Sequence, residues 1–460
     1  MRAGTIALLS LATWVLASAG CTQPQSGEAD PMSQQQQEMW PTVDFQIERE
    51  TAVEGSAGEK FYWTQARIAS IPPGALPDSA RPSGTPKAIM TMSQKLKGAA
   101  DVYYDVYDLT SSDRAQTWTE AESVPQLAIQ RVSKEYRRSI SDLVPRWHAS
   151  SQTVLNTGKA FFYAEGEDGG DRLDRSRRQV AYAVYDPQAG GNGEEGEWGP
   201  QKVLDLPMTD HDSLSLSAPN AGCTQRYDLP GGDVLLPIYY YKLPPAVADT
   251  VSMETFDVAN LMESDSLGNV VTVVRASFDG ETLTYQEHGS ELTIPTGRGL
   301  GEPSLTKYKG TYYLTLRSDE SAWVATSQDG LHYSEPKEWR FDDGELLGSY
   351  NTQQHWVTHS DGLFLVYTRR GAGNENVFRH RAPLFIAQVN PRTLRVIRST
   401  ERVVVPSRGV GIGNFGITRF SEGETWVEVA EYPRREENYD KNRVWVARIQ
   451  WNRPNELYDP

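Results

Sequence analysis

Short runs of β-branched and aromatic residues dominate the sequence from residue 41 onward and constrain the fold most strongly. DVLLPIYYY at 233–241, NVVTVVRASF at 269–278 and RVWVARIQW at 443–451 are examples, and Gly, Asp, Asn and Pro separate them from their neighbours. Runs of this length and composition, bounded by turn-forming residues, predict β-strands. Because no long stretch of this region shows a helical period, we predict an all-β fold.

A recurrent turn motif gives these predicted strands a repeat. The motif occurs as SSDRAQTW at 111–118, SFDGETLTY at 277–285 and SQDGLHY at 327–333. Each copy resembles the Asp box (S-x-D-x-G-x-T-W), known from BNR-repeat propellers, in which the Asp accepts backbone N–H bonds and the aromatic residue packs between strands. The repeat divides the chain into about six units, starting near 60, 145, 215, 300, 352 and 410, each of roughly four strands.

Six such units predict a six-bladed β-propeller, because radial closure of the blades protects their sheet edges. The segment TVDFQIERE at 42–50 precedes the first unit. We expect it to close the ring by pairing with a terminal blade.

The first twenty residues predict export. They contain Arg2, a short apolar run and small residues directly before Cys21, as in a signal peptide. The segment resembles a bacterial lipoprotein signal, which implies that Cys21 is lipidated and becomes the N-terminus. Ser18 stands where such signals usually have an aliphatic residue, so a plain secretory signal is the alternative. The chain is therefore predicted to be a cell-envelope lipoprotein, or otherwise secreted.

The remaining chain divides into a tether and one domain. Residues 21–40 are polar and rich in glutamine, which predicts a disordered tether. Residues 41–460 contain no second low-complexity break and are predicted to form the single propeller domain.

Charge and cysteine content exclude several classes of partner. The net charge is −16, which argues against nucleic acid and anionic membrane surfaces, so membrane contact is expected only through the lipid anchor. The two cysteines, Cys21 and Cys223, predict no internal disulfide framework. His, Cys and Asp show no metal-site spacing, so we expect no catalytic metal and no cofactor.

Four segments carry a resemblance to a known family. They are RIASIPPG at 67–74, GCTQRYDLPGGDVLLPIYY at 222–240, EPSLTKYKGTYYLTLRS at 302–318 and FRHRAPLFIAQVNP at 378–391. They resemble blades of the sialidase (neuraminidase) superfamily. In that family three arginines clamp the substrate carboxylate, and a glutamate raises the nucleophilicity of a tyrosine.

The resemblance implies that Arg67, Arg317 and Arg381 form this clamp, with Glu302 beside them. Arginine suits the role because its forked, permanently charged guanidinium matches a carboxylate. The same cations would hold Glu302 ionised. Glu302 and Arg317 as a purely structural ion pair are the alternative.

The resemblance also implies an acid/base aspartate, which would protonate the leaving oxygen. We assign it to Asp101, with Asp105 as the second candidate. The family's nucleophilic tyrosine has no counterpart at the expected place, which Asn414 and Phe415 occupy. Phenylalanine cannot attack an anomeric carbon. Either Tyr432 or Tyr439 arrives by a different loop path, or the chemistry differs.

Further polar residues stand at predicted blade starts, which face the central funnel of a propeller. We therefore expect them to contact the ligand, and they are His148, Arg226, Gln354 and His355, with Gln353 beside the last two. A packed histidine next to Trp147, and an Arg226 paired with Asp228 or Asp233, are the alternatives.

These residues predict an exported, exo-acting glycoside hydrolase that removes a terminal acidic sugar, sialic acid or a related one, from a glycan. One alternative is a polysaccharide lyase, in which histidine or tyrosine removes a proton beside a uronate carboxylate that the arginines neutralise. The other is a glycan-binding propeller lipoprotein that has lost catalysis.

Overall fold

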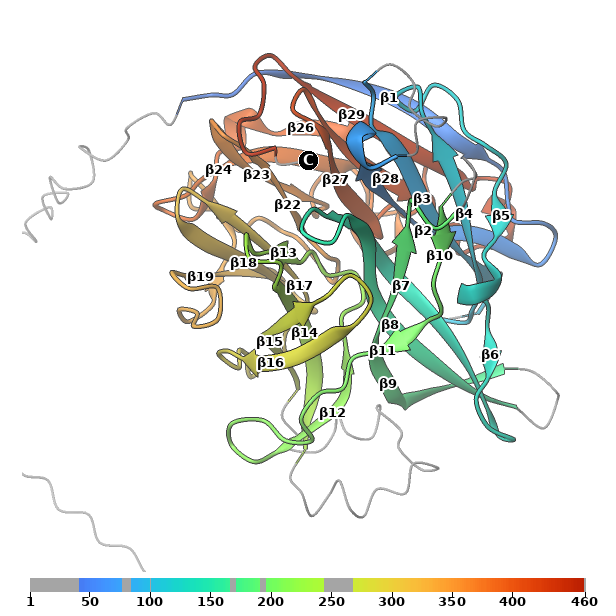
Figure 1. The fold of residues 1–460 in the computed structure, drawn as a ribbon. Coiled ribbons are helices and arrows are strands. Elements are labelled where there is room, and N and C mark those ends of the chain that lie inside the picture. Colours follow the sequence, from blue (N-terminus) through green and yellow to red (C-terminus); the bar gives the residue numbers. More distant parts are fainter. Residues whose placement is uncertain are drawn as a thin grey trace, which may run out of the picture. The chain divides into compact units, whose positions relative to one another are not determined.

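Six antiparallel-rich sheets make up the domain in a computed structural model of the chain (Figure 1), which describes residues 41–76, 84–99, 101–165, 171–190, 196–243 and 268–458. The predicted signal peptide, the tether and Cys21 lie outside these residues. Within the described residues, no helix has the length and apolar character needed to cross a membrane.

Each sheet is built largely from strands that follow one another in the chain. The first contains β2 (Phe61–Ile71), β3 (Lys87–Leu96), β4 (Tyr103–Ser111) and β5 (Glu122–Ser123). The second contains β6 (Gln130–Arg131), β7 (Tyr136–His148), β8 (Thr153–Glu165), β9 (Asp171–Asp186) and β10 (Glu197–Trp198), and β11 (Lys202–Val203) also pairs with β9. The third contains β12 (Ser215–Asn220), β14 (Val234–Leu243), β15 (Asn269–Phe278) and β16 (Leu283–His288), and β13 (Tyr227–Asp228) pairs with β14.

The last three sheets follow the same plan. The fourth contains β17 (Gly301–Tyr308), β18 (Thr311–Arg317), β19 (Ala322–Ser327) and β20 (Lys337–Glu338). The fifth contains β22 (His355–His359), β23 (Gly362–Tyr367), β24 (Leu384–Asn390), β25 (Arg395–Val396) and β21 (Arg340–Phe341), and β26 (Arg402–Val405) pairs with β24. The sixth contains β27 (Phe415–Ser421), β28 (Glu424–Ala430), β29 (Arg443–Trp451) and β1 (Phe45–Glu54).

Short 3-10 turns connect some of these strands in the described residues. They are η2 (Pro73–Ala75), η4 (Pro125–Leu127), η6 (Phe378–His380), η7 (Arg398–Thr400) and η8 (Glu436–Asn438).

The sheets contact one another in a cycle, as in a β-propeller. Strand β2 packs against β27 and β7, β9 against β12, β14 against β17, and β22 against both β17 and β27. The predicted all-β, propeller-like fold is confirmed. The unit predicted to start near residue 145 starts earlier, at β6 (Gln130–Arg131), because β6 is very short and the N-terminal part of β7 is only partly buried and lacks the apolar pattern of a strand start.

The first strand of the domain closes this cycle. Strand β1 pairs antiparallel with β29 from Phe45 opposite Trp451 to Glu54 opposite Arg443 (Figure 1, blue beside red). The predicted pairing of this segment with a terminal blade is confirmed. It ties the start of the domain to its end, with β1 as the edge strand of the sixth sheet and β29 covered on both sides.

The core lies between neighbouring sheets. Between the fifth and sixth sheets, for example, Val357, Phe364 and Ile386 pack with Val427 and Ala447 in one buried cluster. Alternate residues of each strand supply these contacts, which is the period expected of strands with a buried face.

The predicted turns connect the third and fourth strands of three sheets. Asp113 Oδ1 accepts bonds from Ser111 Oγ and Thr117 N, each at 2.9 Å. Asp329 Oδ1 accepts bonds from Leu331 N at 2.9 Å and His332 N at 2.8 Å. Asp279 accepts two backbone N–H bonds in the same way. These carboxylates therefore hold the turns, as the sequence motif predicts.

Candidate active site

Bulges with unusual backbone angles interrupt the innermost strands. The register shifts between Thr64 and Arg67 in β2, between Ser141 and Val144 in β7, and between Gly301 and Ser304 in β17. Gln65, Asp142 and Glu302 lie in these bulges with φ of 57°, 53° and 41°, and Asn351, just before β22, has φ of 46°. Left-handed backbone costs a non-glycine residue about 1–3 kcal/mol and clusters at functional sites.

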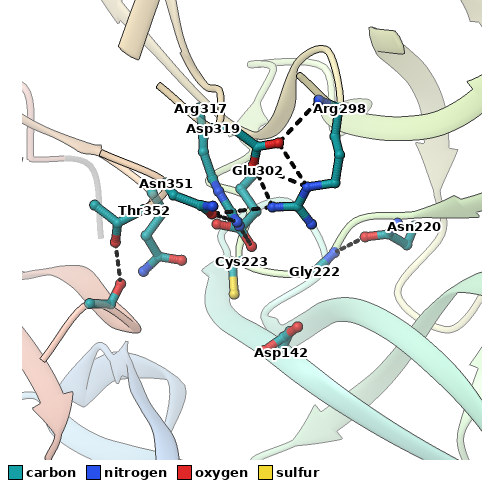
Figure 2. A network of polar contacts seen from close by, with 12 residues as sticks. Asp142, Asn220, Gly222, Cys223, Arg298, Glu302, Arg317, Asp319, Asn351 and Thr352 are labelled. Carbon is teal, nitrogen blue, oxygen red and sulfur yellow. Dashed lines mark hydrogen bonds and ion pairs between the residues drawn. The ribbon is translucent and has the colours of Figure 1, made fainter. Parts of the chain in front are cut away.

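Glu302 and Arg317 form an ion pair at one end of the β17–β18 hairpin. Arg317 Nη1 contacts Glu302 Oε1, and the side chains are 13% and 15% exposed. The register explains the pairing, since Gly301 lies opposite Arg317. Arg317 Nη2 also donates to Asn351 Oδ1 (Figure 2). The hairpin thus places a carboxylate and a guanidinium side by side.

Arg381 reaches the same asparagine from the fifth sheet. Its Nη2 donates to the Asn351 carbonyl oxygen at 2.6 Å, while its Nε is buried and has no hydrogen-bond partner in the structure. Burial, followed by repulsion from Arg317, lowers the pKa of Arg381 to about 10, although Glu302 opposes this. Arg381 therefore stays protonated at neutral pH with one donor available.

Glu302 is ionised at neutral pH. Burial alone would raise the pKa of this carboxyl, but the charges of Arg317, Arg381 and Lys159 outweigh burial and lower it to about 2. Glu302 therefore serves as a fixed negative charge and not as a proton donor.

Arg67 is more completely buried than Arg317 and Arg381, and its guanidinium donates hydrogen bonds to other groups of the protein. It is 1% exposed, and its Nη2 donates to Cys223 Sγ at 3.2 Å while its other nitrogens donate to backbone carbonyls. Burial and the carboxylates of Asp142 and Glu302 raise the pKa of the Cys223 thiol. Figure 2 shows Cys223 in the same neighbourhood as Glu302 and Asn351. Arg67 thus borders the Glu302 cluster from the side of Cys223.

A second polar group at the centre was not predicted from the sequence. Asp142 forms an ion pair with Lys159, and Gln65 Nε2 donates to Asp142 Oδ1 while Asp142 N donates to Gln65 Oε1. Cys223 N donates to the Asp142 carbonyl at 3.0 Å. An acid inside the strand-forming run SISDLV at 139–144 was the one signal available.

Asp101 lies beside a lysine–tyrosine pair. Lys95 Nζ donates to Tyr432 Oη at 2.9 Å and lies 3.8 Å from Asp101 Oδ1. Burial opposes ionisation of Tyr432, but Lys95 and a hydrogen bond with Tyr62 lower its pKa. The charge of Tyr432 also raises the pKa of Arg381, so the Lys95–Tyr432 pair lies near that arginine.

Three other positions considered in the sequence analysis, Asp105, Phe415 and Tyr439, are not part of the Lys95–Tyr432 pair. Asp105 Oδ1 accepts a bond from Ile129 N at 2.9 Å and serves a structural role there. Phe415 is fully buried at the start of β27, where its ring packs edge-on against His355 at 4.9 Å. Tyr439 lies in the turn after η8, where its carbonyl accepts a bond from Ser56 Oγ.

Gln354 and His355 are buried within the centre and bond to protein groups. His355 Nδ1 lies 2.6 Å from Ser304 Oγ, and burial followed by the charge of Arg67 lowers its pKa to about 3, so the ring is neutral. Gln354 Nε2 donates to Ser349 Oγ at 3.0 Å. Gln353 Nε2 donates to the Phe415 carbonyl at 2.6 Å.

The structure does not bring His148 and Arg226 to the Glu302 cluster. His148 Nδ1 lies 2.8 Å from Ser151 Oγ and its Nε2 lies 2.9 Å from the Gly232 carbonyl, while Arg226 Nε is paired with Asp228 at 2.8 Å. Both line a cavity of about 530 Å³ whose walls do not include Glu302. His148 lies six positions beyond Asp142, which is about 20 Å along the extended strand β7.

One group in the described part of the chain has metal-ligand geometry. His211, His288 and Glu291 offer ligand atoms within 4.8 Å of one another. Lys242 Nζ lies 2.9 Å from Glu291 and 3.1 Å from Asp210. An ammonium therefore already balances these carboxylates, which weakens the group as a cation site.

Comparison with known proteins supports the fold. No protein-family model matches the chain, and no curated protein matches it. Among solved structures, the chain is similar to Trypanosoma rangeli sialidase, with a TM-score of 0.55, 13% identity, and coverage of 87% of this chain and 59% of that one. It is also similar to the phage phi92 endosialidase (TM-score 0.51, 10% identity, 90% and 71% coverage).

A third similar structure is a mutant of the NanB sialidase from Streptococcus pneumoniae, with a TM-score of 0.51, 11% identity, and coverage of 87% and 70%. The chain spans about three-fifths of the length of the trypanosomal sialidase that it matches. Likenesses at this level of identity establish the fold alone. The chain has a sialidase-like, all-β fold with a propeller-like arrangement of its sheets.

Proposed function

We propose that this chain is an exported, sialidase-like glycoside hydrolase that removes a terminal acidic sugar from glycans. The observation that carries the proposal is the ionised Glu302, held on left-handed backbone between Arg317 and Arg381. Burying such charges costs free energy that apolar packing would not, and the backbone adds strain. Both costs are easier to explain for a site that binds a charged ligand than for a contact that only stabilises the fold.

The proposal includes the architecture. We infer that each of the six sheets is one blade of a six-bladed propeller, with the three Asp-mediated turns as Asp boxes on the outer edges. The cycle of contacts between sheets supports this inference. The bulged inner strands then direct Asp142 and Glu302 toward the centre of the ring, where Asn351 joins them from the segment before β22.

Arg317 and Arg381 are the proposed binding residues for the substrate carboxylate. Both guanidinium groups already meet at Asn351, and Arg381 Nε is an unused donor. A sugar carboxylate accepts paired bonds from such forks. Arg67 supports the clamp from beneath through Cys223.

Tyr432 is the proposed nucleophile. It takes the role of the family's nucleophilic tyrosine, whose expected place in the sequence is occupied by Phe415. The Lys95 ammonium stabilises the phenolate, so Tyr432 Oη can attack the anomeric carbon as the bond to the leaving oxygen breaks. Asp101 is the proposed acid that protonates this oxygen. The same carboxylate then removes a proton from the water that cleaves the tyrosyl intermediate.

The test is release of sugar from a panel of sialosides, uronic-acid glycans and sulfated polysaccharides. The wild type is compared with Glu302→Gln, Arg317→Gln and Tyr432→Phe. Tyr333→Phe is a matched control, because the Tyr333 hydroxyl has no hydrogen-bond partner in the structure and lies at an outer turn. We expect the first three variants to lose hydrolysis and the control to retain it.

Other outcomes would replace the proposal. A rise in ultraviolet absorbance on uronate substrates, dependent on Tyr432, would identify a lyase in which the phenolate is the base. Glycan binding without turnover on any substrate would identify a non-catalytic binding protein. Lipidation of Cys21 remains a separate prediction, which mass spectrometry of the exported protein tests.

A further inference from the structure

A second polar cavity lies apart from the Glu302 cluster. It has a volume of about 530 Å³, within the range of about 300–1,000 Å³ typical of small-molecule sites. Its walls come from β2, β7, β13, β22, β27 and the chain end, and the exposed residues Ser150 and Glu456 line it. The cavity is therefore reachable from solvent.

Three arginines line this cavity: Arg146, Arg226 and Arg419. Arg226 is 1% exposed and is neutralised by Asp228, with Nε 2.8 Å from Oδ1. Arg146 Nε lies 3.6 Å from the same carboxylate. Asp228 thus serves two cations, and within the cavity wall the only other carboxylate is the exposed Glu456.

Arg419 has no carboxylate partner among the described residues. Its one hydrogen bond runs from Nη1 to the Leu457 carbonyl at 3.3 Å. Burial and then repulsion from Arg146 lower the pKa of Arg419 to about 10, so it remains a cation at neutral pH. Three guanidinium groups therefore share one paired carboxylate, Asp228, and a bound anion would relieve the repulsion between Arg146 and Arg419.

The wall also offers groups for the body of a ligand. Trp147 is part of the wall, but its side chain packs against the hydrophobic cluster between the first and second sheets, where Nε1 is buried. Tyr227, Trp356 and Tyr458 add aromatic surface to the same wall. Aromatic faces beside a cationic end are groups that bind the C–H faces and the carboxylate of a sugar acid.

We propose that this cavity binds a sugar acid of monosaccharide size, with its carboxylate between Arg146 and Arg419. The neutral His148 completes the wall and keeps both nitrogens bonded to the protein. The inference does not depend on hydrolysis, because the cavity shares none of the residues assigned to catalysis.

The test is calorimetric titration of the full chain with D-glucuronate and N-acetylneuraminate, with D-glucose and inorganic phosphate as comparison probes. Arg317→Gln is the background variant, because it removes one of the two arginines proposed to bind the carboxylate near Glu302, and the dependence of the remaining binding on Arg419 then reports the cavity. We expect both sugar acids to bind this variant and D-glucose not to bind. Adding Arg419→Gln weakens binding about tenfold or more, the effect of one lost charge-assisted hydrogen bond.

Arg146→Gln is a second test that does not depend on the folding of the Arg419 variant, and thermal unfolding checks both. Arg453→Gln is the matched control, since its side chain is 82% exposed and outside the cavity wall. Absence of binding in the Arg317→Gln background would overturn the proposal. So would binding that neither cavity variant weakens, or tight binding of phosphate alone. Failure of the hydrolase assay would leave this result unaffected.

Discussion

Replacing Glu428 by glutamine is expected to stabilise the protein at neutral pH. Glu428 lies on β28, is 1% exposed, and accepts bonds at Oε1 from Ile68 N at 3.1 Å and Thr418 Oγ1 at 3.0 Å. Its Oε2 is buried without a partner in the structure. Burial raises the pKa of Glu428 from 4.5 to about 8, and the opposing charge of Arg67 does not offset it.

The direction of the pH effect follows from this difference. In the folded protein Glu428 keeps a proton that the unfolded chain releases above pH 4.5. The contribution of this protonated carboxyl to stability is therefore fully present below pH 4.5 and is lost as the pH rises through about 8. The loss amounts to roughly 1.4 kcal/mol per pH unit within that window, or about 3 kcal/mol between pH 5.5 and 7.5. Glutamine mimics the protonated carboxyl and does not titrate.

The assay is chemical denaturation, followed by tryptophan fluorescence, at pH 5.5 and 7.5. Between pH 5.5 and 7.5, the unfolding free energy of Glu428→Gln is expected to increase by about 3 kcal/mol relative to that of the wild type. Glu422→Gln is the control, because Glu422 is an exposed residue in the turn that connects β27 to β28, the strand that carries Glu428. A difference that stays constant between pH 5.5 and 7.5 would show that Glu428 is already ionised beside Arg67 in the folded protein, and the reasoning would be wrong.

Three further predictions concern the site and the turns. Arg381→Lys keeps the charge but loses the fork, so kcat/KM for an acidic substrate is expected to fall about 10- to 100-fold, and an unchanged value would exclude Arg381 from the clamp. Lys95→Met removes the cation that lowers the pKa of Tyr432, so the pH–rate profile is expected to shift to higher pH; an unshifted profile would argue against phenolate chemistry. Asp329→Ala removes the side chain that accepts bonds from two backbone N–H groups, so it is expected to lower stability by about 1–3 kcal/mol without changing kcat, as thermal unfolding and activity would show.

The strands were predictable because their pattern is local. β14 and β29 are rich in β-branched and aromatic residues, and the turn at Asp329 is specified within seven residues, 327–333. The proximity of Glu302 and Arg317 also follows from local pairing, since they belong to one hairpin.

The rest of the site depends on features that no local pattern encodes. Asp142 meets Gln65 and Lys159 from a bulge in β7, and a bulge leaves no reliable mark in the sequence. Lys95 and Tyr432 are 337 residues apart in the chain, and closure of the ring brings them together. His148 illustrates a different limit: it does lie on an inner strand, but the strand is long enough to carry it into the other cavity.

The most direct test of the proposed site is a crystal structure of the Tyr432→Phe variant soaked with a substrate from the glycan panel. The proposed function predicts the sugar carboxylate within hydrogen-bond distance of both Arg317 and Arg381, with the anomeric carbon facing residue 432. A sugar whose carboxylate contacts neither arginine, or that occupies only the cavity beside Arg419, would contradict it.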